Sequence, residues 1–157
     1  MNIKLIAIGK TDSKQLNILV DDYKKRLGHY IKFKMEIIPD IKNAKSLSKA
    51  QQKQKEGELI LAQLKTTDLL VLLDENGKQF DSVSFSSYLQ KHMNSGIKQL
   101  VFVIGGPYGF SEEVYKKANG KISLSKMTFS HQMIRLFFIE QLYRGFTILR
   151  NEPYHHR

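Results

Sequence analysis

The sequence predicts an α/β protein in which helices flank a mainly parallel β-sheet. Apolar runs alternate along the chain with segments of helical periodicity. The apolar runs are also continuous, as is typical of strands covered on both faces. The chain has 157 residues, 41% of them hydrophobic and 25% charged, which suffices for one core but is short for two domains. We therefore expect residues 1–157 to form one domain.

The first half of the chain predicts two strands and two helices. The run "IKLIAIG" (3–9) predicts a buried strand, and "FKMEIIPD" (33–40) predicts a second one. Between them, apolar residues at helical spacing predict an amphipathic helix that ends at Gly28. Residues 41–55 are polar and rich in lysine, typical either of a mobile basic loop or of the start of a helix that continues through 57–64. We favour the helix, with a flexible first part.

The second half continues the alternation of strands and helices. The predicted strands are 68–74, followed by a turn at 75–78, then 99–106, which runs into glycines, and a short fifth strand at 121–125. Residues 82–93 and 111–118 predict helices, the latter with Ser111 as its N-cap and two acidic residues in its first turn. A short polar loop then precedes a long, largely apolar helix.

The charge balance favours a phosphate-rich partner. Lys and Arg total 25 against 15 acidic residues, so the net charge is +10, although simple solubility is an alternative explanation. The excess is concentrated in residues 1–65, where Lys24, Lys25, Arg26 and the segment 42–55 are candidates for phosphate contacts. The absence of cysteine excludes disulfides and thiolate chemistry. Because no signal peptide or membrane-length segment is evident, we expect a soluble, cytoplasmic protein.

Three predicted strand ends are candidates for a ligand site, because ligands of open α/β sheets bind beyond the carboxyl ends of the strands. These ends are Leu73-Asp74, the "GGPYG" turn at 105–109, and the loop 124–129. The glycine turn lacks G-x-G-x-x-G and a P-loop lysine, which argues against a dinucleotide or a nucleoside triphosphate, and such a sequence is also common in ordinary tight turns. The loop 124–129 offers backbone groups and an apolar wall, which suit an adenine ring.

The final helix carries Arg135, Glu140 and Arg144 among residues that are apolar on more than one face. Unpaired burial of these charges would be costly, and the spacing of Glu140 and Arg144 suits either a structural ion pair or a role in a site. An apolar helix of this kind packs in the core or against a second subunit, so a homodimer is expected. The ending "NEPYHHR" is either a frayed terminus or a group able to stack on a base and move a proton.

Taken together, "VFVIGGPYGF", "LSKMTFSHQMIRLFFIEQLYRGFTI" and "NEPYHHR" resemble the RlmH family of SPOUT-class 23S rRNA (pseudouridine-N3) methyltransferases. The segments "IKLIAIGK" and "KEGELIL" extend the resemblance over the whole length. The resemblance implies a homodimer whose α/β fold carries a trefoil knot near its carboxyl end, a topology that general rules make rare. It also implies methylation of N3 of pseudouridine 1915 in helix 69 on the assembled 70S ribosome, without a metal or a membrane.

The same resemblance implies the site residues. S-adenosyl-L-methionine would lie in the knot, bound by Leu73, Gly105, Leu124, Ser125, Lys126, Met127, Thr128 and Phe129. At the acceptor, His155 would remove the N3 proton and Tyr154 would stack or orient the base, with Arg144 contacting phosphate or base and His131 shaping the pocket.

Two departures from the family pattern leave points open. A second histidine, His156, precedes Arg157, so which histidine acts is unsettled, although position favours His155. Ser130 stands where a proline is common, and we expect it to serve as a helix N-cap. Two rival functions also stay open: a SPOUT methyltransferase acting on tRNA or another rRNA position, and a non-catalytic ribosome-binding or assembly factor.

Overall fold

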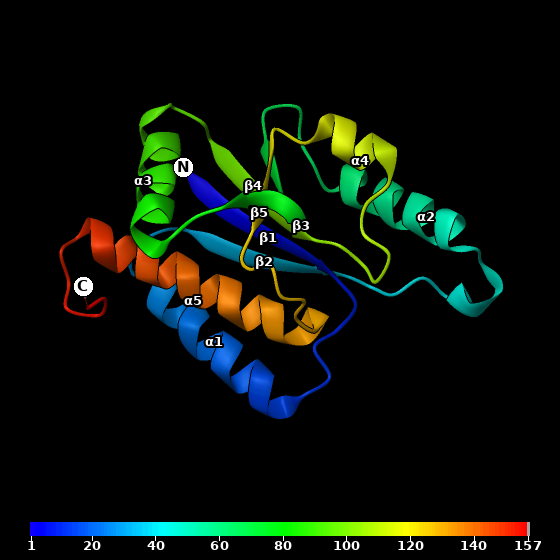
Figure 1. Cartoon of the computed structure of the whole chain (residues 1–157), viewed down its shortest axis with the longest axis horizontal. Helices are drawn as coiled ribbons and strands as arrows, with labels where there is room; N and C mark the ends of the chain where they lie inside the picture. Colours follow the sequence, from blue (N-terminus) through cyan, green and yellow to red (C-terminus); the bar gives the residue numbers. More distant parts are fainter. Residues whose placement is uncertain (157) are drawn as a thin grey trace.

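The structure is a computed structural model that describes residues 1–156, so Arg157 of the predicted tail lies outside the described residues. Its strands and helices alternate, and the termini lie near the same end of the molecule (Figure 1). In chain order the elements are β1 (Asn2–Ile8), α1 (Lys14–Gly28), β2 (Phe33–Ile38), a 3-10 turn (Ala44–Ser46), α2 (Lys49–Ala62), β3 (Leu69–Gln79), α3 (Ser82–Asn94), β4 (Gln99–Ile104), α4 (Glu112–Lys117), β5 (Gly120–Ser123) and α5 (His131–Leu149).

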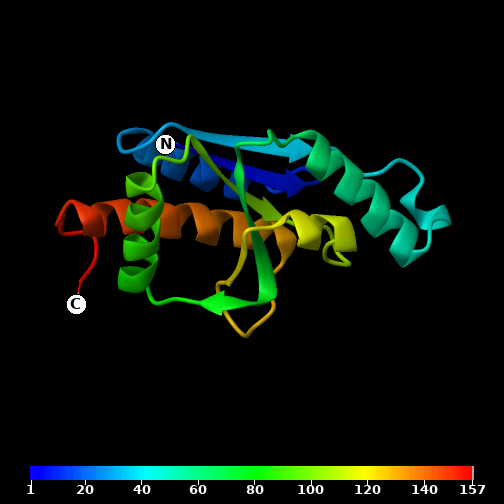
Figure 2. The ribbon, with the colours of Figure 1, turned by 90° about the horizontal axis from the view of Figure 1, so that it is seen from above.

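The five strands form one parallel sheet in the order β2-β1-β4-β3-β5, which confirms the predicted fold class. Helices α1, α3 and α5 cover one face, where α3 crosses α5 close to the carboxyl end of α5 (Figure 2). Helices α2 and α4 pack together on the other face. The described chain contains no helix long and apolar enough to cross a membrane.

The continuous apolar strands are explained by this three-layer arrangement. In β1, Ile3 and Leu5 pack into the core beneath α1, α3 and α5, whereas Ile6 and Ile8 pack into the core beneath α2 and α4. Since successive side chains of a strand point to opposite faces, a strand covered on both sides favours apolar residues on both faces.

Two segments refine the sequence-based prediction. Helix α2 begins at Lys49, because Ser48 and Gln51 form a capping box, so the helical interpretation holds for 49–62. Residues 75–78, predicted as a turn, lie within β3, and the pairing with β5 shifts register between Leu73 and Lys78. At Gly77 a Cβ atom would lie 2.6 Å from the backbone nitrogen of Ile122, so only glycine permits this close approach of the two strands.

Arg135 anchors the first turns of α5 to the carboxyl end of β1. Its side chain is 1% exposed and donates hydrogen bonds to the carbonyl oxygens of Ile8 (2.6 Å) and Gly9 (2.8 Å) and to Thr11 Oγ1 (2.9 Å). Main-chain and hydroxyl oxygens therefore supply the hydrogen bonds that make its burial tolerable. The contact of Arg135 with the end of β1 places the start of α5 at the carboxyl edge of the sheet. This is the edge at which the sequence predicts a ligand site.

Candidate active site

A cavity of about 440 Å³ lies at the carboxyl edge of the sheet, where the three predicted segments come together. Its volume falls within the range of about 300–1,000 Å³ that is typical of small-molecule sites. Seven of the eight predicted cofactor-binding residues line it: Leu73, Gly105, Leu124, Ser125, Met127, Thr128 and Phe129. Lys126 is exposed and is not part of the lining. His131, at the first position of α5, lines the same cavity.

The glycine turn 105–109 lines this cavity with three glycines together with Pro107 and Tyr108. The amide of Gly109 donates to the carbonyl oxygen of Gly106 (3.2 Å), and Gly109 has a φ of +79°, a conformation that favours glycine. A Cβ atom at Gly105 would lie 3.0 Å from the Phe110 ring, so a larger residue there would press against this ring. The turn can therefore bring its main chain directly against a ligand.

The loop between β5 and α5 is shaped by serine hydroxyl groups. Ser123 Oγ donates to the carbonyl oxygen of Ser125 (2.8 Å), and the Met127 amide donates to Ser125 Oγ (3.0 Å). Ser130 then caps α5 by accepting a hydrogen bond from the Met133 amide (3.1 Å), which confirms the predicted N-cap. These bonds order a loop that has no regular secondary structure, which suits it to form one wall of a binding site.

Asp74 and Tyr115 form a polar part of the cavity wall. Tyr115 Oη donates to Asp74 Oδ2 (2.5 Å), and burial, followed by this hydrogen bond, raises the pKa of Tyr115 to about 12. Tyr115 is thus a neutral donor at physiological pH. Sequence reasoning did not find Tyr115, because it lies on the exposed side of α4 in a helix with no motif around it.

The wall of the cavity combines apolar and polar groups. Leu73 and Leu124 supply apolar surface, and the turn at 105–109 contributes three glycines. The Asp74–Tyr115 pair supplies polar atoms at the margin. Such a wall can hold a nucleoside with polar substituents, and S-adenosylmethionine stays the ligand predicted for it.

A second constellation forms at the opposite end of α5, where the chain end folds back on the helix. Glu140 Oε1 accepts hydrogen bonds from Arg144 Nη2 (2.6 Å) and Nε (3.1 Å) and from Tyr154 Oη (2.9 Å). Tyr154 Oη also lies 3.0 Å from Tyr23 Oη, and Arg144 Nη1 lies 3.4 Å from His155 Nδ1. We call Tyr23, Glu140, Arg144, Tyr154 and His155 the tail cluster.

The tail cluster joins three predicted catalytic residues to two that sequence reasoning did not assign. The ion pair foreseen from the spacing of Glu140 and Arg144 is present, and it also orders the chain end. That spacing was the available signal for Glu140. No sequence signal pointed to Tyr23, which lies 131 positions before Tyr154.

The electrostatics of the cluster define its protonation. Burial acts to lower the pKa of Arg144, but the hydrogen bond and charge of Glu140 outweigh it, so the net effect is a raised pKa. Burial first, and then hydrogen bonds to Tyr23 and Glu140, raise the pKa of Tyr154 above its ordinary value. At neutral pH Arg144 is therefore a guanidinium, and Tyr154 is a neutral phenol that donates to Glu140.

The contact between Arg144 and His155 constrains proton chemistry. A guanidinium can only donate, so Nδ1 of His155 acts as the acceptor in this contact, and the proton of the neutral ring lies on Nε2. The lone pair of the neutral imidazole thus faces Arg144. For His155 to accept a proton from a substrate, Arg144 must move away or exchange this contact for one with the substrate.

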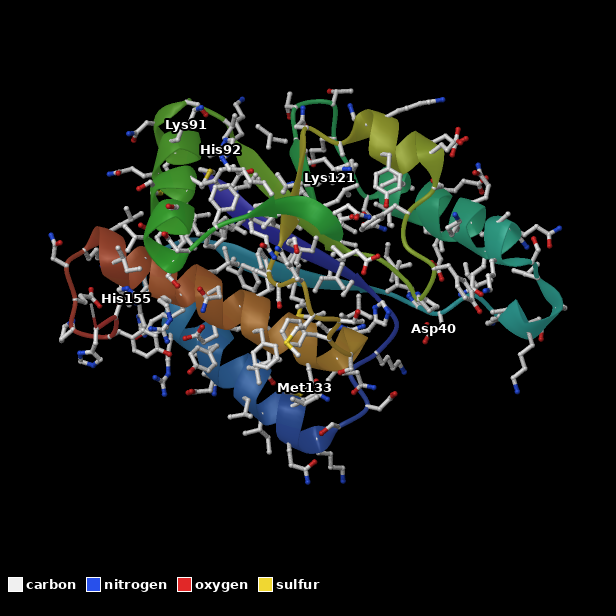
Figure 3. All side chains as sticks on the ribbon, viewed as in Figure 1. Asp40, Lys91, His92, Lys121, Met133 and His155 are labelled. Carbon is white, nitrogen blue, oxygen red and sulfur yellow. The ribbon has the colours of Figure 1, made fainter. Side chains whose placement is uncertain are left out.

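The cavity and the tail cluster are separated along α5. His131 and Arg144 are 13 positions apart on this helix, which corresponds to about 20 Å at a rise of 1.5 Å per residue. Figure 3 shows the same separation, with Met133 near one end of α5 and His155 near the other. The structure therefore brings Arg144, Tyr154 and His155 together, and groups His131 with the cofactor-binding residues instead.

Among residues 1–156, no group of three or more histidine, aspartate or glutamate side chains is arranged to hold a metal ion.

Comparisons with known proteins show the family of this chain. A family model described as "Predicted SPOUT methyltransferase" matches residues 1–155. The chain is 77% identical over 157 residues to the "Ribosomal RNA large subunit methyltransferase H" of Flavobacterium johnsoniae, covering 100% of both chains. Proteins of the same name from Christiangramia forsetii and Bacteroides thetaiotaomicron are 70% identical over 157 residues and 56% identical over 156, with 100% and 99% of both chains covered.

Proposed function

Since this chain belongs to the RlmH family of SPOUT methyltransferases, we propose that it methylates N3 of pseudouridine 1915 in helix 69 of 23S rRNA. The donor is S-adenosyl-L-methionine and the substrate particle is the assembled 70S ribosome in the cytoplasm. Relatives that match the chain from end to end carry the name of a large-subunit rRNA methyltransferase, which supports an rRNA substrate. The observation that carries the proposal is one cavity lined by seven of the eight residues expected at the methyl donor.

The sulfonium of S-adenosylmethionine supplies an activated methyl group, so the protein must chiefly align the donor with the acceptor and remove the acceptor's proton. The glycine turn 105–109 and the loop 124–129 bind and orient the donor through backbone atoms. Leu73, Phe129 and Ile134 exclude water from its apolar parts. His131 closes the wall of the cavity at the start of α5.

The tail cluster supplies the acceptor side of the reaction. His155 accepts the N3 proton, and Tyr154 orients the base by stacking or by a hydrogen bond. Arg144 turns from His155 toward the negative charge that develops on the base, and Glu140 holds Arg144 and Tyr154 in place. Because Glu140 Oε1 already accepts three hydrogen bonds, Glu140 orients its neighbours and does not take the proton.

A homodimer brings the two constellations together. In one chain they lie about 20 Å apart on a rigid helix, whereas methyl transfer needs the reacting atoms in contact. Exposed apolar side chains of α1 and α5 (Ile18, Leu19, Met133 and Phe137) offer a surface for a second copy. We propose that residues 1–157 act as one knotted domain and that each cofactor cavity is completed by the partner's tail cluster.

Restored activity in mixed dimers tests whether the tail cluster of one subunit acts at the cavity of the other. Gly105→Val blocks the cavity and His155→Ala disables the tail, so each variant alone should be inactive. If tails act on the partner's cavity, a mixed dimer has one intact site and regains activity. If each tail serves its own chain, the mixture stays inactive, which would refute the exchange of tails.

The basic residues before and within α2 provide a surface for RNA phosphates. Lys42, Lys45 and Lys49 are exposed, and Lys49 Nζ lies 5.4 Å from the ring centre of Tyr108, a residue that lines the cavity. Phosphate contacts here would position the ribosome next to the methyl donor without reading base sequence.

The decisive experiment is transfer of labelled methyl from S-adenosylmethionine to 70S ribosomes purified from a strain that lacks this modification. Free 23S rRNA and tRNA serve as parallel substrates, and mapping of the labelled nucleotide identifies the acceptor. Label confined to the helix 69 pseudouridine on 70S particles supports the proposal. Label on tRNA or another rRNA position changes the substrate, and binding to ribosomes without transfer favours an assembly factor.

A further inference from the structure

Glu56 is a buried acid that the reaction described above does not use. It lies on α2 and is 3% exposed. Its Oε1 accepts a hydrogen bond from Gln52 Nε2 (2.9 Å), whereas Oε2 is shielded from solvent and has no partner among the described residues. A buried carboxyl oxygen without a partner is costly, so its position calls for an explanation.

The Glu56 carboxyl group packs against the glycine turn. A Cβ atom at Gly106 would lie 2.7 Å from Glu56 Cδ, so the carboxyl group occupies the space that a side chain at 106 would need. Next to it, a Cβ atom at Gly57 would lie 3.1 Å from Cβ of Ser111, the N-cap residue of α4. Helix α2 thus supports both ends of the segment 106–111 from outside the cavity.

The surroundings favour the neutral form of this acid. Burial is the main cause that raises the pKa of Glu56, and the charge of Asp40 raises it further, whereas Gln52 and His131 act in the opposite direction. Asp40 follows β2, and His131 begins α5. These are the titratable groups that face Glu56, since the turn contributes glycine backbone at this contact.

We propose that Glu56 is a positioning residue for S-adenosylmethionine, whose buried carboxyl group packs against Gly106 and holds the backbone of the turn 105–109 in the conformation that contacts the donor. This inference rests on the proposed function. Loss of the side chain leaves a void into which the turn relaxes. Ionisation acts in the same direction, because a buried charge is stabilised when the turn opens to water.

Calorimetric titration of S-adenosylmethionine into the full-length protein tests the inference without measuring activity. Glu56→Ala should bind the donor about tenfold more weakly, because the backbone of the turn 105–109 is then no longer held in the binding conformation. Glu56→Gln, which keeps the shape, should restore most of that affinity. The wild-type affinity should fall as pH rises through the pKa of Glu56, and Glu56→Gln should abolish this dependence. The control is Glu58→Ala, an exposed residue of the same helix.

A double-variant cycle separates positioning from general damage. Gly106→Ala should weaken binding, because its new methyl group overlaps the Glu56 carboxyl group. The double variant Glu56→Ala/Gly106→Ala should bind more tightly than Gly106→Ala alone, because the methyl group enters the vacated space.

Three results would overturn the inference: wild-type affinity in Glu56→Ala, simple addition of the two losses in the double variant, or an unchanged pH dependence in Glu56→Gln. If Glu56→Ala does not fold, the pH dependence of donor affinity in Glu56→Gln, compared with the wild type, decides whether the inference holds. If the wild-type protein itself fails to bind S-adenosylmethionine, the proposed function fails, and this inference fails with it.

Discussion

Replacement of Arg135 by methionine tests the anchor between α5 and β1. Methionine fills similar volume but leaves the carbonyl oxygens of Ile8 and Gly9 without their donors. Each buried carbonyl oxygen left without a hydrogen-bond donor costs about 1–3 kcal/mol of folding free energy, so the two together cost about 2–6 kcal/mol. Relief from burying the guanidinium offsets part of this loss, and we expect the free energy of unfolding to fall by about 3 kcal/mol.

For a chain of this size, such a change lowers Tm by about 6–12 °C. Urea denaturation gives the free energy and differential scanning calorimetry gives Tm. Arg26→Met is the matched control, because Arg26 is exposed and pairs with Asp22 on the surface, so its loss should leave the free energy of unfolding nearly unchanged. A loss below about 1 kcal/mol in Arg135→Met would refute the argument that these hydrogen bonds hold α5 to the sheet.

Three further predictions concern charge. Glu140→Gln should slow methyl transfer by about 10–100-fold with little effect on S-adenosylmethionine affinity. The reason is that the change removes charged hydrogen bonds in the tail cluster and not in the cavity. Equal losses in donor binding and in methyl transfer would contradict this prediction. Burial, and next the charge of Lys91, lower the pKa of His92 below its ordinary value. The unfolded chain therefore binds a proton at His92 more readily than the folded chain does. The free energy of unfolding should fall as pH drops below about 6.5. Urea unfolding at pH 5.5 and 7.5 should show a smaller drop for His92→Gln than for the wild type. Lys49→Ala should weaken ribosome binding and reduce the slope of log affinity against log salt by about 1, whereas Lys98→Ala, at the amino end of β4, should not.

Local patterns were sufficient to predict the fold class and the strand ends that line the cavity. Continuous apolar runs such as 3–9 and 99–106 indicated strands covered on both faces, and the sheet has helices on both faces. The strand ends at Leu73, Gly105 and Leu124 were predicted because ligands gather at the carboxyl edge of parallel strands, and these residues line one cavity. Residues 75–78 were misassigned as a simple turn, because their contact with Ile122 depends on a strand that follows much later in the chain.

The sequence by itself determined the elements, the charge balance and the kinds of chemistry available, because these depend on residue type and short-range periodicity. Only the tertiary structure decided which distant groups meet: Arg135 with Gly9, Tyr23 with Tyr154, and Glu56 with the glycine turn. It also separated His131 from the tail cluster along α5. The physical reason is that such contacts join segments far apart in the chain. They arise from how the packed layers align, and this alignment leaves no periodic pattern in the sequence.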